Sequence, residues 1–441
     1  MFLVGVYEKE ITPPLGFNIP GYFNARYAKG VKSRLYARAM VISDGENRIA
    51  IAGLDGLLPP RDLRVNVLNR LAEYSDITAD NVLLFVNHTH TGIPLKNKDA
   101  TADELEYWHL LTYLLADTIV LAEQRLVPAR ILFARGNVDD ISFVRDYYMK
   151  NTTPTTNPGR CNPNIIGPTE DIDPDLPVLF AESENGEPIG ALLCFACHQD
   201  CVGGDEYCSD FSGIVITELK KMYGDKFVAL FMEGTAGNVN YTDVSRTEVE
   251  PDYYVKMGKR IADETMRVLS AAEYLADKGV GAMLKTIPIP PTEIAEEEIK
   301  RARHLIATVT PIEGEDIRAD DSEQYYLRMA QRLIGLIDSR PEFYTVPVQV
   351  LRVGNYLLYG FPSEIYTTFG RQIKNESPVK YYTIATLCNI SYGYVPSREM
   401  FYPTIYSSKP GANLLHQEAG YMMSEKLLEM ADELMRDVLN D

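Results

Sequence analysis

Apolar and polar positions along the chain follow two periodicities, one typical of buried strands and one of amphipathic helices. Residues 48–55 and 81–92 each contain a short apolar run of strand length. Between them, residues 61–74 place leucine and valine at helical spacing. This order predicts a strand–helix–strand unit in which the two strands lie side by side and parallel.

The rest of the chain continues this pattern. Further strands are predicted at 3–11, 34–42, 129–134, 188–198, 344–353, 356–360 and 381–388, and one that runs into a glycine-rich turn within 227–240. Helices are predicted at 102–125, 252–275, 292–339, 364–374 and 414–439. These elements predict an α/β fold with mixed sheets flanked by helices. We expect one large domain over residues 1–441, with residues 292–339 as a helical excursion.

Histidines follow two of the apolar runs. His88 and His90 end the second run, where strand side chains two residues apart share a face, so both imidazoles are expected to point at one spot. Such a pair can begin a metal site or form ordinary buried hydrogen bonds, and the pattern leaves both interpretations open. His198 ends a later strand and the turn Glu233–Asn240 ends another. We therefore expect three strands to deliver polar residues to one sheet edge.

Two other groups of residues allow either a metal-related or a structural interpretation. Asp55 ends the strand beside His88, where its carboxylate either orients a ligand histidine or caps a loop. Cys194, Cys197, Cys201 and Cys208 lie close together in sequence. Because strand residues three apart face opposite sides, we favour buried thiols over a cysteine-ligated metal.

The amino-acid composition and net charge exclude some classes of binding partner. The chain carries 62 acidic and 43 basic residues, a formal charge of −19, so its surface repels phosphate backbones and argues against nucleic acid. No apolar stretch approaches the ~20 residues of a membrane span. The amino terminus lacks the features of a secretory signal. We expect a cytoplasmic protein that acts on a small molecule.

A series of short motifs in one order resembles the catalytic domain of the neutral, non-lysosomal ceramidases over nearly the whole chain. Each motif is weak alone, but their common order is specific. They are Glu10-Ile-Thr-Pro-Pro-Leu-Gly16, Leu35-Tyr-Ala-Arg-Ala39, Asn87-His-Thr-His-Thr-Gly92, Ile172-Asp-Pro-Asp175, Phe195-Ala-Cys-His198, Gly234-Thr-Ala-Gly-Asn-Val-Asn240, Pro362-Ser-Glu364 with Thr367-Thr-Phe-Gly-Arg371, and Cys388-Asn-Ile-Ser-Tyr-Gly-Tyr394.

The resemblance implies one zinc ion, Zn2+, held by two histidines, a glutamate and a tyrosine. Position by position, these ligands look like His88, His198, Glu364 and Tyr394. The resemblance also implies that His90 stabilises the developing oxyanion and that Arg145 lies on the substrate side. The zinc would lower the pKa of a water molecule and polarise the carbonyl under attack.

One position departs from the family pattern. Gly234 stands where the family has a serine, and the adjacent Thr235 is a candidate to supply the missing hydroxyl. We expect the missing side chain at Gly234 to enlarge the pocket beside the metal. The chain resembles a short, bacterial-type member without the carboxyl-terminal domain.

These features together predict a zinc-dependent amidohydrolase that uses zinc-activated water. Its substrate is expected to carry an acyl group and to be more soluble than ceramide. A role of the protein in lipid metabolism is consistent with such a substrate. The alternatives are a zinc esterase or lactonase, or a non-catalytic ligand-binding relative that lacks the family serine. The sequence does not define the oligomeric state.

Overall fold

The computed structural model describes residues 1–96, 100–150, 153–312 and 322–440. Its largest sheet contains β1 Phe2–Glu10, β5 Tyr36–Ser43, β6 Arg48–Leu54, β7 Val82–Val86, β8 Val127–Asn137, β13 Asp175–Ser183, β14 Pro188–Phe195, β16 Val228–Glu233 and β18 Glu273–Tyr274. The strand order is β16–β14–β13–β8–β1–β5–β6–β7, with β18 on β8. The two outer pairs, β14–β16 and β6–β7, are parallel, whereas the strands between them are antiparallel.

The large sheet bends so that its two edges approach each other. Leu83 and Phe85 of β7 share one buried cluster with Leu230 and Met232 of β16, although these strands lie at opposite ends of the strand order. The bend therefore brings the carboxyl ends of β7 and β16 to the same region of the molecule.

A second, four-stranded sheet packs against the first. It contains β19 Val280–Ile289, β20 Tyr344–Val353, β21 Tyr356–Gly360 and β23 Tyr381–Ala385, in that order. Leu351 and Leu358 join the buried cluster of the large sheet. Val346 and Val348 contribute to a separate cluster with Leu427 of the closing helix. The second sheet thus buries both of its faces, which explains its continuous apolar strands.

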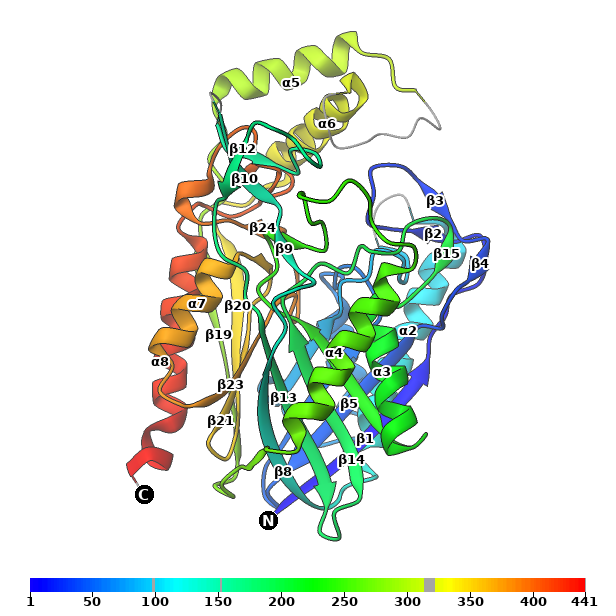
Figure 1. Ribbon diagram of the computed structural model, residues 1–441, viewed down its shortest axis with the longest axis vertical. Helices are drawn as coiled ribbons and strands as arrows, with labels where there is room; N and C mark the ends of the chain where they lie inside the picture. The colour runs from blue at the N-terminus through cyan, green and yellow to red at the C-terminus, as the bar shows by residue number, and fades with distance from the viewer. Residues whose placement is uncertain (97–99, 151–152, 313–321, 441) are drawn as a thin grey trace.

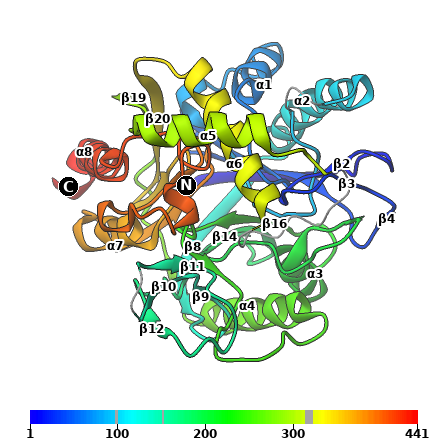
Figure 2. The same cartoon turned by 90° about the horizontal axis from the view of Figure 1, so that it is seen from above.

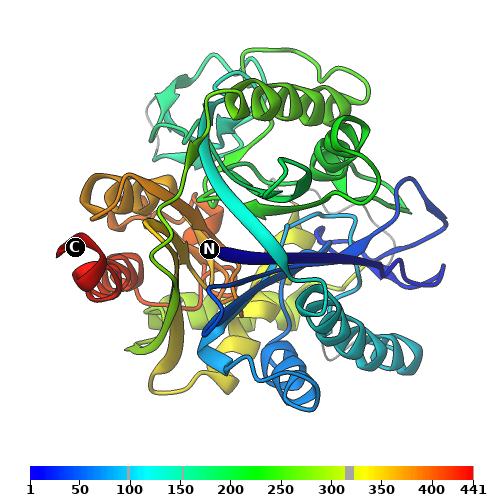
Figure 3. The same ribbon diagram turned by 90° about the horizontal axis from the view of Figure 1, so that it is seen from below.

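Three pairs of helices surround the two sheets, as the view from below shows (Figure 3). The pairs are α1 Leu63–Leu71 with α2 Ala102–Glu123, α3 Asp210–Tyr223 with α4 Tyr253–Leu269, and α7 Thr367–Glu376 with α8 Ala419–Asn440. The helix α2 begins with a capping box, in which Thr101 accepts from the backbone of Glu104 and the Glu104 side chain accepts in return. None of the helices in the described residues is long and apolar enough to cross a membrane.

A fourth pair of helices, α5 Glu296–Thr308 and α6 Glu323–Ser339, lies above the strand ends (Figures 1 and 2). Both fall within the predicted helical excursion, of which residues 313–321 lie outside the described part of the chain. Short strands complete the upper layer: β2 Asn18–Ile19, β3 Arg26–Tyr27, β4 Gly30–Val31, β9 Phe143–Val144, β10 Asp146–Met149, β11 Thr155–Thr156, β12 Ile165–Pro168, β15 Glu206–Tyr207, β17 Val239–Asn240, β22 Glu364–Ile365 and β24 Tyr394–Val395. The predicted α/β class with mixed, helix-flanked sheets is confirmed.

The parallel strand pairs organise the site. Each pair is joined through a helix: β6 to β7 through α1, β14 to β16 through α3, and β21 to β23 through α7. Ligands bind at the carboxyl ends of strands in such units. The segments that leave β7, β14 and β21 carry the candidate ligands His88, His198 and Glu364.

Candidate metal centre

His88 lies in a loop rather than in a strand. The strand β7 ends at Val86, and His88 adopts a left-handed backbone with φ of 71°, so the prediction that His88 and His90 share a strand face was wrong. Tertiary contacts hold the loop: the His88 backbone N–H donates to Gly56 O at 2.9 Å, and its Nδ1 bonds Leu57 O at 2.8 Å. Because Leu57 O only accepts, Nδ1 keeps its proton, and Nε2 presents a lone pair when the ring is neutral, as a metal ligand must be.

His198 is positioned in the same manner. It follows β14, and its Nδ1 donates to the carbonyls of Ala236 at 2.9 Å and Val239 at 3.0 Å. Its Nε2 therefore carries a lone pair, which lies 3.1 Å from the hydroxyl of Tyr394. Both imidazoles are buried, at 2% and 1% exposure of the side chain.

Glu364 and Tyr394 face each other across a short parallel pair, β22 with β24. One carboxylate oxygen of Glu364, Oε2, lies 3.3 Å from His88 Nε2 and 3.2 Å from His198 Nε2. The predicted helix start at Glu364 was wrong: α7 begins at Thr367, whose N–H donates to the Asn238 side chain at 3.0 Å. Glu364 instead lies in the short strand β22, with Oε2 directed at the histidines.

Three of the separations among these four side chains match those of a tetrahedral metal site. Donors about 2.0–2.1 Å from a zinc ion at tetrahedral angles are about 3.3 Å apart, and the three separations above are 3.1, 3.2 and 3.3 Å. His88 Nε2 and Glu364 Oε2 are buried and have no hydrogen-bond partner within the described chain. Buried polar atoms normally have partners, so this donor set is suited to a cation.

His90 approaches the same centre from another side. Its ring centroid lies 5.0 Å from that of His88 and 5.9 Å from that of His198, and the three imidazoles form a group that could hold a metal ion. Nδ1 of His90 bonds Gly21 O at 3.1 Å, which leaves Nε2 as a buried lone pair. In this tautomer His90 accepts a proton, whereas the oxyanion role expected from the sequence requires a donor.

The carboxylates shape the charge of the site. Burial lowers the pKa of His88, but Glu233 and Glu364 outweigh it and raise the value to about 9. Burial and Arg145 lower the pKa of His198 to about 4. For Glu364, burial raises the pKa, but His88 and His198 hold it well below its ordinary value. Without a metal, the site therefore pairs a charged His88 with an ionised Glu364.

The comparisons with known proteins bear on this site. The sequence model of the family described as "Neutral/alkaline non-lysosomal ceramidase, N-terminal" matches residues 2–242, more than half of the chain. The chain belongs to this family. The matched region contains His88, His90, Arg145 and His198.

Individual relatives agree with the family assignment. The neutral ceramidase of Pseudomonas aeruginosa is 26% identical over 227 residues, which cover 48% of this chain and 32% of the relative. The neutral ceramidase of Drosophila melanogaster is 28% identical over 263 residues, which cover 54% and 36%. The chain thus matches about a third of the length of these relatives. The crystal structure of the Pseudomonas aeruginosa neutral ceramidase superposes with a TM-score of 0.74 at 20% identity, covering 99% of this chain and 75% of the other.

Arg145, expected on the substrate side of this ceramidase family site, is buried behind Tyr394. Its guanidinium carbon lies 4.8 Å from the centre of the Tyr394 ring. One nitrogen, Nη2, donates to Gly237 O at 2.6 Å and to the Ser407 hydroxyl at 3.3 Å. Arg145 therefore supports the phenol ring by a cation–π contact, and its charge counteracts the effect of burial on the Tyr394 pKa.

The two residues at the family serine position point away from the centre. A Cβ at Gly234 would lie 3.0 Å from the Ala196 backbone nitrogen, so the expectation that Gly234 enlarges the metal pocket was wrong. The Thr235 hydroxyl packs against Gly370 of α7, where a Cβ would meet it at 2.4 Å. Thr235 is buried, and its Oγ1 has no partner among the residues the structure describes.

Glu233 lies behind the two imidazoles. Its Oε2 is 3.9 Å from His88 Nδ1 and its Oε1 is 3.8 Å from His198 Nδ1. Burial raises its pKa to about 8, partly offset by His88. The sequence places Glu233 at the end of an apolar strand and so near the site, but the pattern does not reveal that its carboxylate reaches both histidines.

Asp55 and the cysteines have structural roles. Asp55 pairs with Arg38 at 3.0 Å and accepts from the Asn87 side chain at 2.9 Å, so it orders the loop before His88 without contacting the imidazole.

Cys194, Cys197 and Cys208 are buried free thiols and Cys201 is half-buried. No metal-binding cluster in the described residues includes a cysteine.

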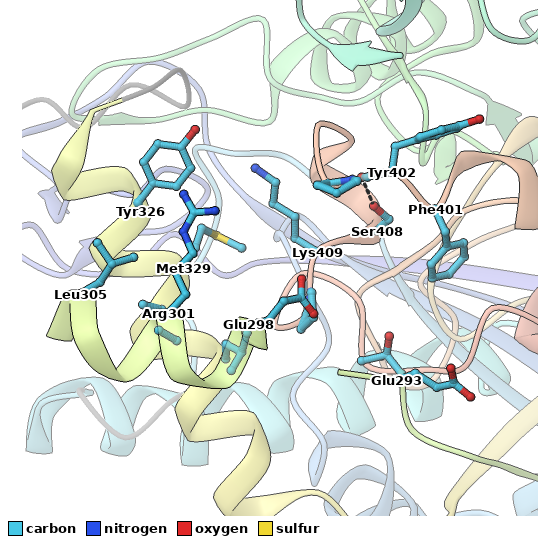
Figure 4. A pocket seen from close by; sticks show the side chains of 16 residues that line it. Glu293, Glu298, Arg301, Leu305, Tyr326, Met329, Phe401, Tyr402, Ser408 and Lys409 are labelled. Atoms are coloured by element: carbon cyan, nitrogen blue, oxygen red, sulfur yellow. Dashed lines mark hydrogen bonds between the residues drawn. The ribbon is translucent and has the colours of Figure 1, made fainter. Parts of the chain in front are cut away.

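A second cavity, of about 310 Å³, lies between α5, α6 and the segment Phe401–Pro410 (Figure 4). Met329, Leu333 and Phe401 give it an apolar lining, and Arg301, Lys409, Glu293 and Glu298 add charge. The same segment carries Tyr406, whose ring lies 5.6 Å from that of Tyr394. The cavity is thus separated from the metal centre by one stretch of chain.

Proposed function

We propose that this protein is a zinc-dependent hydrolase of an amide bond in an acyl-bearing small molecule. The observation that carries the proposal is the convergence of two imidazole lone pairs, one carboxylate oxygen and one phenol at tetrahedral separations. Membership in the ceramidase family and relatives named neutral ceramidases support amide hydrolysis as the reaction class.

In this proposal His88, His198, Glu364 and Tyr394 hold the zinc. A bound zinc ion polarises a carbonyl oxygen and lowers the pKa of water. Backbone carbonyls at Leu57, Ala236 and Val239 keep both ligand imidazoles in the required tautomer.

His90 accepts a proton at Nε2 and is the candidate to pass it to the departing nitrogen. Its geometry is held by Gly21 O on Nδ1 and by Arg26, which donates to the His90 carbonyl at 2.6 Å. Arg145 keeps the Tyr394 ring in place from behind. Neither Gly234 nor Thr235 takes part, because both face packed protein.

We propose a substrate more soluble than ceramide. The net charge of −19 disfavours approach to anionic lipid surfaces, which supports a dissolved substrate in the cytoplasm. A zinc esterase or lactonase would use the same centre, and a binding protein would hold the metal without turnover.

The test combines metal analysis with an activity screen. Protein purified without chelators is expected to hold about one equivalent of zinc and to cleave short N-acyl compounds from a panel of amides, esters and lactones. Cleavage of esters or lactones alone would favour the esterase alternative. Zinc-loaded protein that turns over no member of the panel would favour the binding protein, and protein that takes up no zinc would refute the metal centre.

A further inference from the structure

Glu233 is a buried carboxylate for which the proposed reaction has no role. Its side chain is 2% exposed, and neither oxygen has a hydrogen-bond partner among the described residues. A carboxylate removed from water without hydrogen bonds is costly to keep, and proteins retain one where an opposite charge compensates it. The compensating charge must therefore be sought among its neighbours.

The neighbours of Glu233 are the rear edges of both ligand histidines. Its two oxygens lie 3.9 Å from His88 Nδ1 and 3.8 Å from His198 Nδ1. Both nitrogens already donate to backbone carbonyls, at 2.8 Å for His88 and at 2.9 and 3.0 Å for His198. The carboxylate consequently adds negative charge behind the rings without replacing the hydrogen bonds that fix their tautomers.

The backbone holds this carboxylate in place. Glu233 ends β16 opposite Phe195 of β14, in the strand that leads to His198. Its carbonyl accepts from the Thr386 backbone N–H at 2.9 Å and from the Thr386 hydroxyl at 3.2 Å. These contacts place the side chain between the two βαβ units that deliver the histidines.

Charged groups of both signs surround the metal centre, among them Arg145, Asp200 and Glu233. A zinc dication in front of the rings is offset by Glu364 and, when ionised, by Tyr394. Arg145 adds a positive charge behind Tyr394. Glu233 contributes negative charge behind the two histidine rings.

We propose that Glu233 is a positioning residue, whose buried carboxylate strengthens metal binding by His88 and His198 from behind. The proposal rests on the metal centre of the proposed function. A carboxylate on the far side of a ligand imidazole raises the basicity of the ligand, and losing such a partner typically weakens metal affinity about 10- to 100-fold. Glu233 differs from the usual arrangement, in which each ligand histidine has its own carboxylate, because its one carboxylate lies behind two ligand imidazoles.

The experiment measures the zinc dissociation constant by competition with a chelator, for the wild-type protein and for Glu233→Gln. The amide keeps the volume of the side chain and removes its charge, so zinc binding is measured at pH 9, above the Glu233 pKa of about 8. We expect zinc binding about 10- to 100-fold weaker in Glu233→Gln. Glu233→Asp keeps the charge and is expected to bind zinc more tightly than Glu233→Gln; it also serves if the amide variant does not fold.

The control is Glu264→Gln, the same substitution at a buried carboxylate of α4 that bonds Asn137 and Arg267 but no imidazole. Its zinc affinity should equal that of the wild type. Equal zinc affinity in Glu233→Gln and wild type would overturn the inference and leave the proposed function standing. A lower melting temperature of metal-free Glu233→Gln with unchanged zinc affinity would assign Glu233 a structural role instead. Wild-type protein that binds no zinc would overturn both proposals.

Discussion

Glu364→Gln tests whether Glu364 is a metal ligand, because it exchanges one carboxylate oxygen for an amide nitrogen and keeps the size of the side chain. Glu364 Oε2 is within 3.3 Å of both histidine Nε2 atoms, and the carboxylate pairs with a charged His88 when no metal is bound. Removing one partner of a buried ion pair costs about 3–5 kcal/mol. An unfolding entropy of about 2.1 cal/mol/K per residue gives about 0.9 kcal/mol/K for 441 residues. The melting temperature of metal-free Glu364→Gln should therefore fall by about 3–5 °C.

The response to zinc gives the second half of this prediction. Zinc at a thousandfold excess over its dissociation constant stabilises the wild type by about 4.1 kcal/mol, which raises its melting temperature by about 4 °C. The same zinc concentration should produce little or no shift in Glu364→Gln, because the amide is a poor zinc ligand.

The assay is thermal unfolding with and without zinc, followed by calorimetry or by the fluorescence of Trp108. Glu104→Gln is a suitable control, because Glu104 is a buried glutamate in the capping box of α2, far from the centre in the fold. It should lose stability but keep the full zinc shift. A full zinc shift in Glu364→Gln would refute the assignment of Glu364 as a ligand.

Three further predictions follow from the same geometry. Because His88 has a pKa of about 9 in the metal-free protein, zinc must displace its proton, so zinc affinity should rise at least about tenfold per pH unit between pH 7 and pH 9. Titrations that find no pH dependence in this range would contradict this. Tyr394→Phe should lose both zinc affinity and hydrolysis of a short N-acyl substrate, because it removes a zinc ligand. Thr235→Val should keep both, since the Thr235 hydroxyl faces α7. A Thr235→Val protein that holds zinc but is inactive would assign catalysis to the threonine. Asp55→Asn should lower the free energy of unfolding in a denaturant titration by about 1–3 kcal/mol, because it removes the charge that faces Arg38 at 3.0 Å while Glu8 still pairs with that guanidinium at 3.4 Å. No measurable loss would show that the Asp55–Arg38 pair is not needed for stability.

Apolar periodicity alone predicted most strands of the two sheets, but it missed β13, β18 and β19. The predicted strands at 344–353 and 356–360 coincide with β20 and β21, and the helix at 61–74 contains α1. These elements are buried on both faces or amphipathic, so their pattern reflects local backbone geometry and burial directly. The order of the ceramidase-like motifs likewise identified the family from the sequence.

The directions of the site side chains were decided by tertiary structure. His88 lies in a left-handed loop held by Gly56 and Leu57, and Glu364 is extended in a strand pair with Tyr394, while the Asn238 side chain bonds the first residue of α7, Thr367. Loop and turn backbones depend on hydrogen bonds to segments distant in sequence, which no periodicity encodes. The bend of the large sheet, which brings β7 beside β16, then decides that Glu233 reaches both histidines while Gly234 and Thr235 face packed protein.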